Sequence, residues 1–209
     1  MARTMALDLP DDLQLPLRSG SGHWYWLGGR PALDLVNTLR ERWRRRVETL
    51  VTTDDLAGWL VQAGLIPEPM PVRRAVLEET RRLREAIDAG VLAAVAGERP
   101  PADAVRVIDG WLAHAGGRPS LTLIGAEPTL GERPAADSPR RAVGTVALDA
   151  ATMLGVPEQR ARLRICGAED CSARFYDRSP AACRRWCSMR TCGNAAKARR
   201  HRERRRVEA

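Results

Sequence analysis

The sequence has few of the residues that acid–base catalysis and insertion into a membrane require. It contains three His residues, no H-E-x-x-H pattern and no cluster of Ser, His and Asp, so a general acid or base is hard to place. Its longest apolar or small stretch, near Ala89–Gly97, falls far short of the about 20 residues that span a bilayer. These absences predict that the protein is not an enzyme and has no membrane partner.

The first twenty residues lack the apolar core of a secretory signal. They carry acids and prolines instead, and they show no clear hydrophobic period. We therefore predict a flexible N-terminal arm over residues 1–22 and a cytoplasmic location. Cysteines stay reduced in the cytoplasm, which bears on the five Cys residues of the chain.

Lysine is almost missing, and the positive charge of the chain is nearly all arginine. One Lys stands among 34 basic residues, and the net charge is +8. From Arg160 to Ala209 there are fourteen Arg and the one Lys against five acids, a local balance of +10, so the remaining residues sum to −2. Abundant Ala, Gly and Pro suggest a bias toward GC-rich codons, but the concentration of Arg near the end exceeds that background. A basic module of this kind indicates a polyanionic partner.

Four cysteines in the basic segment form two pairs of equal spacing. Cys166-x4-Cys171 and Cys187-x4-Cys192 are separated by fifteen residues. This arrangement is typical of a structural zinc site, in which four thiolates leave no open position for chemistry. Disulfides, redox-active thiols and unrelated free thiols are the alternatives, and a reducing compartment favours Zn²⁺. Cys183 is left over, and we interpret it as a free thiol that is either without consequence or made reactive by neighbouring Arg residues.

Helical signals recur through the first three quarters of the chain. After a short extended segment over Trp24–Leu27, apolar periodicity and helix-start residues predict helices over 31–43, 53–64, 71–94, 101–116 and 140–154. The first of these rests on Leu33, Val36, Leu39 and Trp43, which fall at helical spacing. Between the last two, Ser120–Ile124 alternates as a strand does, and 125–139 reads as a loop around at most a second short strand.

The predicted fold class is therefore mainly α. We expect a multihelical array with a minor β-hairpin, followed by a small C-terminal four-cysteine zinc finger. The six Trp residues are expected to fill the core, and the isolated His114 near a helix end is expected to be structural. The body from Trp24 to Gly155 has its own helix starts and near-neutral charge, so we expect it to fold without the finger.

The cysteine module contains two alternating runs and a basic helix. Ala161–Ile165 and Ser172–Asp177 are predicted to form a zinc hairpin in which Phe175 and Tyr176 pack. A helix follows from Ser188, with Gly193 and Asn194 interrupting its first turns. Beyond Asn194 the helix has no apolar stripe and so gains nothing from burial. It either frays as a solvated tail or lies against a polyanion, with these cations and one His along one side: Arg190, Lys197, Arg200, His201 and Arg204.

Two motifs resemble known families. The run RRWCSMRTCGN followed by A-AK-ARR is similar to the signature of the CGNR zinc-finger proteins. GGRPALDLVNTL and DLAGWLVQAGL resemble the ABATE domain, a family of stress-induced transcription regulators that precedes this finger. The resemblance runs from about Trp24 to Arg204. It implies a helical ABATE-like domain over 23–157 and a CGNR-type zinc finger with a basic C-terminal helix over 158–209.

The resemblance also implies which residues act. The four zinc ligands correspond to Cys166, Cys171, Cys187 and Cys192, in agreement with the spacing. One departure is Ala195, which stands where the motif has its arginine, so a contact made by that arginine is lacking here or is supplied by a neighbour such as Arg190, Lys197 or Arg199.

Together these features predict a DNA-binding transcription regulator. The zinc-folded module grips DNA, and the helical domain senses a signal of unknown identity or mediates association, with a homodimer as one form. The cations expected to contact nucleic acid are Arg184, Arg185, Arg190, Lys197, Arg199, Arg200 and Arg204. The main alternative is a zinc-stabilised adaptor that binds RNA or protein, in which Phe175 and Tyr176 stack on bases. An enzyme housed in the helical body is a third and weaker possibility.

Overall fold

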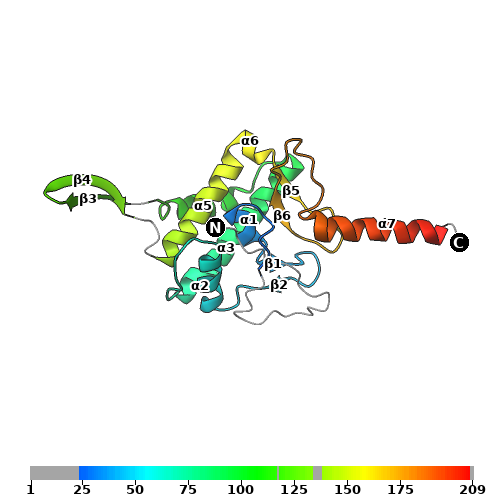
Figure 1. Cartoon of the computed structure of the whole chain (residues 1–209), viewed down its shortest axis with the longest axis horizontal. Helices are drawn as coiled ribbons and strands as arrows, with labels where there is room; N and C mark the ends of the chain where they lie inside the picture. The colour runs from blue at the N-terminus through cyan, green and yellow to red at the C-terminus, as the bar shows by residue number, and fades with distance from the viewer. Residues whose placement is uncertain (1–23, 117, 134–137, 208–209) are drawn as a thin grey trace.

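A computed structural model of the chain describes residues 24–116, 118–133 and 138–207. Helices form a body at the centre, a two-stranded arm projects from one end of it, and a long helix projects from the other (Figure 1). The helices before the finger are Pro31–Val36 (α1), Thr53–Gln62 (α2), Arg74–Ala96 (α3), Ala102–Leu112 (α4), Pro139–Gly155 (α5) and Pro157–Arg160 (α6). The mainly helical fold class predicted from the sequence is confirmed.

Six strands form three separate antiparallel hairpins. Leu39–Arg40 (β1) pairs with Val47–Glu48 (β2), Arg118–Ile124 (β3) with Glu127–Arg133 (β4), and Leu163–Ile165 (β5) with Arg174–Tyr176 (β6). The last hairpin is the predicted zinc hairpin, and β3 with β4 is the minor hairpin. The chain then enters a π-helix, Met189–Gly193 (η2), and a final α-helix, Asn194–Val207 (α7).

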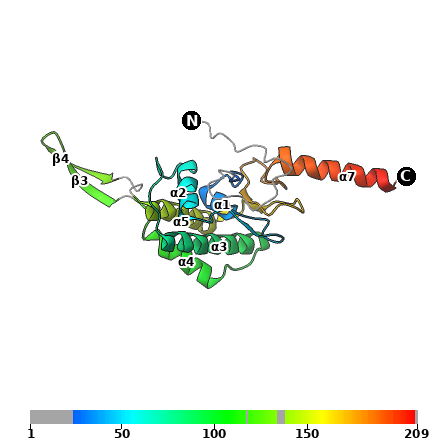
Figure 2. The ribbon, with the colours of Figure 1, turned by 90° about the horizontal axis from the view of Figure 1, so that it is seen from below.

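The core of the body is built around α1. Its residues from Ala32 to Val36 are all buried, and it packs against both α3 and α5. Figure 2 shows α3, α4 and α5 lying side by side, with α1 and α2 above them. Local signals set the helix ends: Thr52 and Asp55 form a capping box that starts α2, and Gly97 ends α3 in the left-handed conformation with φ of 72°.

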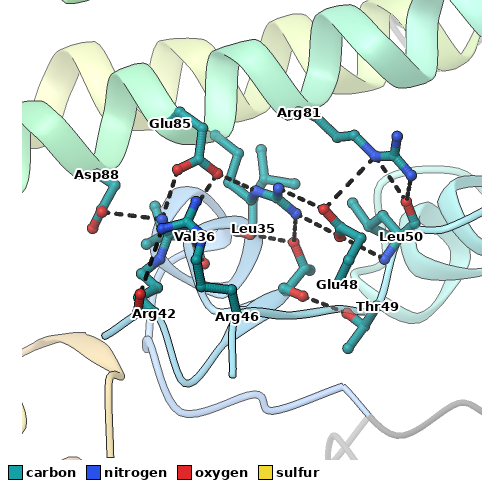
Figure 3. Close-up of polar contacts among 12 residues, drawn as sticks. Leu35, Val36, Arg42, Arg46, Glu48, Thr49, Leu50, Arg81, Glu85 and Asp88 are labelled. Carbon is teal, nitrogen blue, oxygen red and sulfur yellow. Dashed lines mark hydrogen bonds and ion pairs between the residues drawn. The ribbon is translucent and has the colours of Figure 1, made fainter. Parts of the chain in front are cut away.

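The first predicted helix is shorter than its periodicity indicated. It ends at Val36, and the prediction that it continues to Trp43 is wrong. The chain reverses instead through β1 and β2, with Glu41 and Arg46 at positive φ. The reason is tertiary: the reversal carries Arg42 into the body, where its guanidinium nitrogen Nη1 lies 2.7 Å from Oε2 of Glu85 and 3.1 Å from Oδ2 of Asp88 on α3 (Figure 3). A long helix would point this side chain elsewhere. The third helix also begins later than predicted, at Arg74 rather than Pro71.

The tryptophans divide between core and surface. Trp24, Trp59 and Trp111 are buried as expected, and Trp26 packs on the core with its ring centroid 5.9 Å from that of Trp59. The expectation is wrong for Trp43, which is 49% exposed, because it lies beyond the point where the first helix ends. His114 has the structural role that was predicted, since its ring packs edge-on against Trp111.

The zinc hairpin is joined to the body through a shared core. Leu163 of β5 is buried within the same apolar cluster as the helices. Asn37, which caps α1, pairs with the backbone of Arg174 on β6 in both directions: its Nδ2 donates to the carbonyl at 3.0 Å and its Oδ1 accepts from the N–H at 2.9 Å. Tyr176 adds a further backbone bond to Gly28. This packing argues against the expectation that the body folds without the finger.

Candidate metal centre and nucleic-acid surface

The four paired cysteines come together in space. Their sulfur atoms all lie within 4.8 Å of one another, with Sγ–Sγ distances of 3.8 Å for Cys171–Cys187 and 3.7 Å for Cys187–Cys192. Four thiolates around zinc at ~2.3 Å have sulfur–sulfur separations of ~3.8 Å in a tetrahedron. The cluster thus has the size and the donor set of a closed zinc site.

Local structure fixes each sulfur in turn. Cys166 follows β5 and donates its N–H to Ala173 across the hairpin, and a turn at Ala168 presents Cys171. Cys187 is held by the backbone bond from Gly167 to Arg185 just before it. Cys192 lies inside η2, so that the wider π-turn carries the last sulfur toward the other three.

The start of η2 is specified by the sequence. Ser188 caps it by accepting a hydrogen bond from the N–H of Thr191, as expected of the capping residue. Gly193 ends the π-turn tightly, since a Cβ there would lie 2.8 Å from Sδ of Met189. The predicted interruption at Gly193 and Asn194 is therefore confirmed as the change from π-helix to α7.

The thiols affect one another strongly because they are so close. Hydrogen bonding with Cys171 lowers the pKa of Cys166, whereas contact with Cys166 raises the pKa of Cys187. Four thiolates at this separation repel, so they do not all ionise without a cation among them. A divalent metal removes that conflict, and Cys183, which is exposed and outside the cluster, takes no part in it.

The predicted nucleic-acid contacts fall into two groups. Arg190, Lys197, Arg200 and Arg204 are exposed on η2 and α7, and Arg185 is exposed with its guanidinium 5.3 Å from the ring centroid of Trp186. Within α7, three of these cations follow the spacing of one helical face (197, 200 and 204). The helix has a mean hydropathy far on the polar side and projects beyond the finger (Figure 1).

Two of the seven predicted cations are engaged within the protein. Arg184 donates to the carbonyl of Cys187 at 2.7 Å and lies over the ring of Phe175. Arg199 pairs with Glu169 and with Asp170, at 3.0 Å from Oδ2 of the latter, and the nearby Glu169 charge raises the pKa of Arg199. Asp170 also pairs with Arg44 of the β1–β2 loop. These contacts connect α7 to the finger and the finger to the body.

A groove of about 940 Å³ lies between the body, the finger and the start of α7. Tyr25, Trp26 and Arg40 line it from the body, and Trp186, Arg190 and Arg200 line it from the finger and α7. Ala195, which stands in place of the motif arginine, is exposed in the same groove. The groove presents aromatic faces and cations together, which is a combination that nucleic-acid-binding surfaces share.

Arg40 is the residue of this groove that the sequence analysis missed. Its guanidinium lies 3.9 Å from the ring centroid of Tyr25 and donates Nη2–H to the hydroxyl. Its Nε and Nη1 are buried without a hydrogen-bond partner, and burial lowers the pKa of Arg40 while it raises the pKa of Tyr25 to about 12. No sequence signal marked the pair, because Arg40 was assigned to a helix and Tyr25 to a separate extended segment.

A helical domain that carries a four-cysteine finger and a basic helix defines the class of protein. Residues 29–157 match the model of the ABATE family, described as "Putative stress-induced transcription regulator", and residues 162–205 match that of the CGNR zinc finger. The first match covers more than half of the chain, so the protein belongs to the ABATE family. Zinc is therefore the cofactor of its finger. No curated protein matches the sequence.

No helix among the described residues has the length and apolar character needed to cross a membrane. Both matched families are of the regulator and zinc-finger types rather than enzymes.

Proposed function

We propose that the protein is a cytoplasmic DNA-binding transcription regulator. Cys166, Cys171, Cys187 and Cys192 hold one zinc ion, which supplies a closed structural centre and no open coordination position. The exposed cations on η2 and α7 contact the phosphate backbone. The observation that carries the proposal is α7 itself, a fourteen-residue basic helix with no apolar face, whose first turn is attached to the metal centre.

The basic helix gains little from burial, so its stability in isolation is poor. A polyanion lying along it supplies the missing interaction, because each phosphate contact releases counterions from the nucleic acid. The contacts proposed are those of Arg185, Arg190, Lys197, Arg200 and Arg204. Arg184 and Arg199, whose guanidinium groups bond within the protein, are proposed to hold the finger and α7 in position instead.

The adaptor alternative loses its structural support at Phe175. The side chain is fully buried beneath Arg184, so it is not available to stack on an RNA base. Tyr176 packs against the body core with Arg30 over its ring. Duplex DNA along an exposed helix requires neither ring.

For the helical domain, we propose that it senses a signal or mediates association. The groove beside Arg40 supports sensing, because a ligand held there would touch both the body and the start of α7. Such a ligand would change the orientation of the basic helix relative to the body, which is the change that a regulator needs.

The DNA-binding proposal is tested by replacing Lys197, Arg200 and Arg204 together with Ala. The triple variant removes at most three phosphate contacts, so the slope of log affinity against log salt should fall by about 2.7. Binding of the full chain to a duplex oligonucleotide, measured by fluorescence anisotropy across a salt series, gives both the affinity and the slope.

The matched control removes three exposed cations from the body, at Arg82, Arg99 and Arg106. It lowers the net charge equally and should leave the slope unchanged. If the two triple variants behave alike, binding reflects net charge only and the proposal fails. If neither differs from the parent, α7 is a solvated tail. Single-stranded RNA at equal salt serves as the competitor, and tighter binding to RNA than to duplex DNA would favour the adaptor.

A further inference from the structure

The β3–β4 hairpin forms an arm that the proposed function does not use. Seven cross-strand pairs join the two strands, from Arg118 with Arg133 at the base to Ile124 with Glu127 near the tip. In the described part of the chain, no other helix or strand packs substantially against it. Both views show it projecting from the end of the body opposite to α7 (Figures 1 and 2).

One face of the arm is apolar and the other is not. Side chains alternate along each strand, so the cross-strand pairs Leu121–Leu130 and Leu123–Pro128 share a face. The three leucines are 70–73% exposed. The pairs Thr122–Thr129 and Ile124–Glu127 occupy the opposite face.

This arm is poorly stabilised by itself. A two-stranded hairpin standing alone is at best marginally stable in water, and it needs a third strand or a packed apolar face to persist. The apolar face of the arm has no such cover from its own body. A contiguous patch of exposed leucine side chains marks an interaction surface rather than ordinary protein surface.

We propose that the apolar face of the arm is covered by the same face of a second copy of this chain. An apolar patch that meets its own image about a two-fold axis is self-complementary, as an isologous dimer requires. The charges favour an antiparallel arrangement: Glu127 is at the tip, while the base carries Arg118 and Arg133 beside Glu132, a net positive end. A two-fold axis across the arms brings each negative tip beside the positive base of the other copy.

The position of the arm also suits a second copy. Because the arm and α7 leave the body at opposite ends, two arms can meet while both basic helices stay accessible (Figure 1). The patch is small, so the interface falls at or below the ~1,200 Å² that separates weak from standard interfaces. We therefore expect a reversible dimer with a dissociation constant in the micromolar range, independent of DNA.

The test is sedimentation of the full chain at concentrations from about 1 to 100 μM, the range in which such a dissociation constant lies. The mass of the parent should rise with concentration toward twice the 23.1 kDa of one chain. Replacing Leu121 and Leu130 together by Thr keeps strand propensity but removes the apolar face, so this variant should stay monomeric throughout.

The matched control is Ile124→Thr, which removes a similarly exposed apolar side chain from the opposite face of the same hairpin. It should dimerise as the parent does. Glu127→Arg should weaken the dimer at low salt, because the new cation meets the positive base of the second copy.

Zinc content and thermal unfolding of each variant, measured at the lowest concentration, show that the body is intact, since the arm lies outside its core. A parent that is monomeric at every concentration overturns the proposal. So does an unchanged dimer in the double variant, or equal loss in the Ile124→Thr control. A dimer that Glu127→Arg leaves unaffected contradicts the antiparallel arrangement. A monomeric parent whose arm binds another protein's apolar segment would assign the face to a different occupant.

Discussion

Arg174 on β6 places its Nε 2.7 Å from Oδ1 of Asp88 on α3, so the zinc hairpin and the longest helix of the body share a buried ion pair. The side chains are 2% and 9% exposed. Arg42 of the β1–β2 loop pairs with the same Asp88, so three segments distant in sequence meet at one carboxylate (Figure 3).

The first prediction concerns this ion pair. Arg174→Met leaves Asp88 with only one of its two cationic partners in a site that water does not reach. Removing one partner of a buried pair costs about 3 kcal/mol, so chemical denaturation should show a loss of that order. The double variant Arg174→Met/Asp88→Asn should recover part of the loss, because the uncompensated charge is gone. Strictly additive effects would mean that the two side chains do not interact in solution.

The second prediction is that a fragment ending at Gly155 does not fold cooperatively. It lacks Leu163, which is 1% exposed within the body core, and it leaves Asn37 and Asp88 without their partners on β6. Its thermal transition, followed by circular dichroism, should be broad or absent. A fragment ending at Ala195 keeps the finger and should melt almost as the full chain does. A sharp transition in the shorter fragment would show that the body is independent of the finger.

The third prediction concerns the metal. Cys187→Ser removes a central sulfur of the cluster and should release zinc and unfold the finger, because metal binding and folding are coupled in such sites. Cys183→Ser is the matched control, since Cys183 is exposed and outside the cluster, and it should keep a full equivalent of zinc. Metal content by atomic emission, measured on both purified variants, decides the matter. Stoichiometric zinc in the Cys187 variant would contradict the ligand assignment.

The fourth prediction follows from Tyr25, whose pKa is raised from 10.0 to about 12 by burial. The folded protein therefore keeps this proton between pH 10 and 12, where the unfolded chain loses it. The contribution to stability is present below pH 10 and is lost as the pH rises toward 12. Absorbance at 295 nm should show a tyrosine that ionises late, and Tyr25→Phe should abolish that late component. A titration unchanged by the substitution would contradict the buried position of Tyr25 beside Arg40.

Local chemistry was sufficient to predict much of this protein from its sequence. The spacing of four cysteines predicted a cluster that the structure brings within zinc-binding distance, and Ser188 with Gly193 predicted where the last helix begins and changes. The capping box at Thr52 and the glycine at position 97 are likewise local signals, read from neighbours in sequence. Such features depend on short-range hydrogen bonds and backbone conformations, which each segment carries with it.

Tertiary structure alone decided the rest. Periodicity favoured a helix through Trp43, but the buried pairing of Arg42 with Glu85 and Asp88 ended it at Val36. The sequence also divided body from finger by charge, whereas Leu163, Arg174 and Asn37 join them in one core. Two of the seven predicted DNA contacts, Arg184 and Arg199, bond within the protein because the fold brings acceptors to them. A sequence pattern records which side chains can be buried or charged, but their partners are fixed only when distant segments pack together.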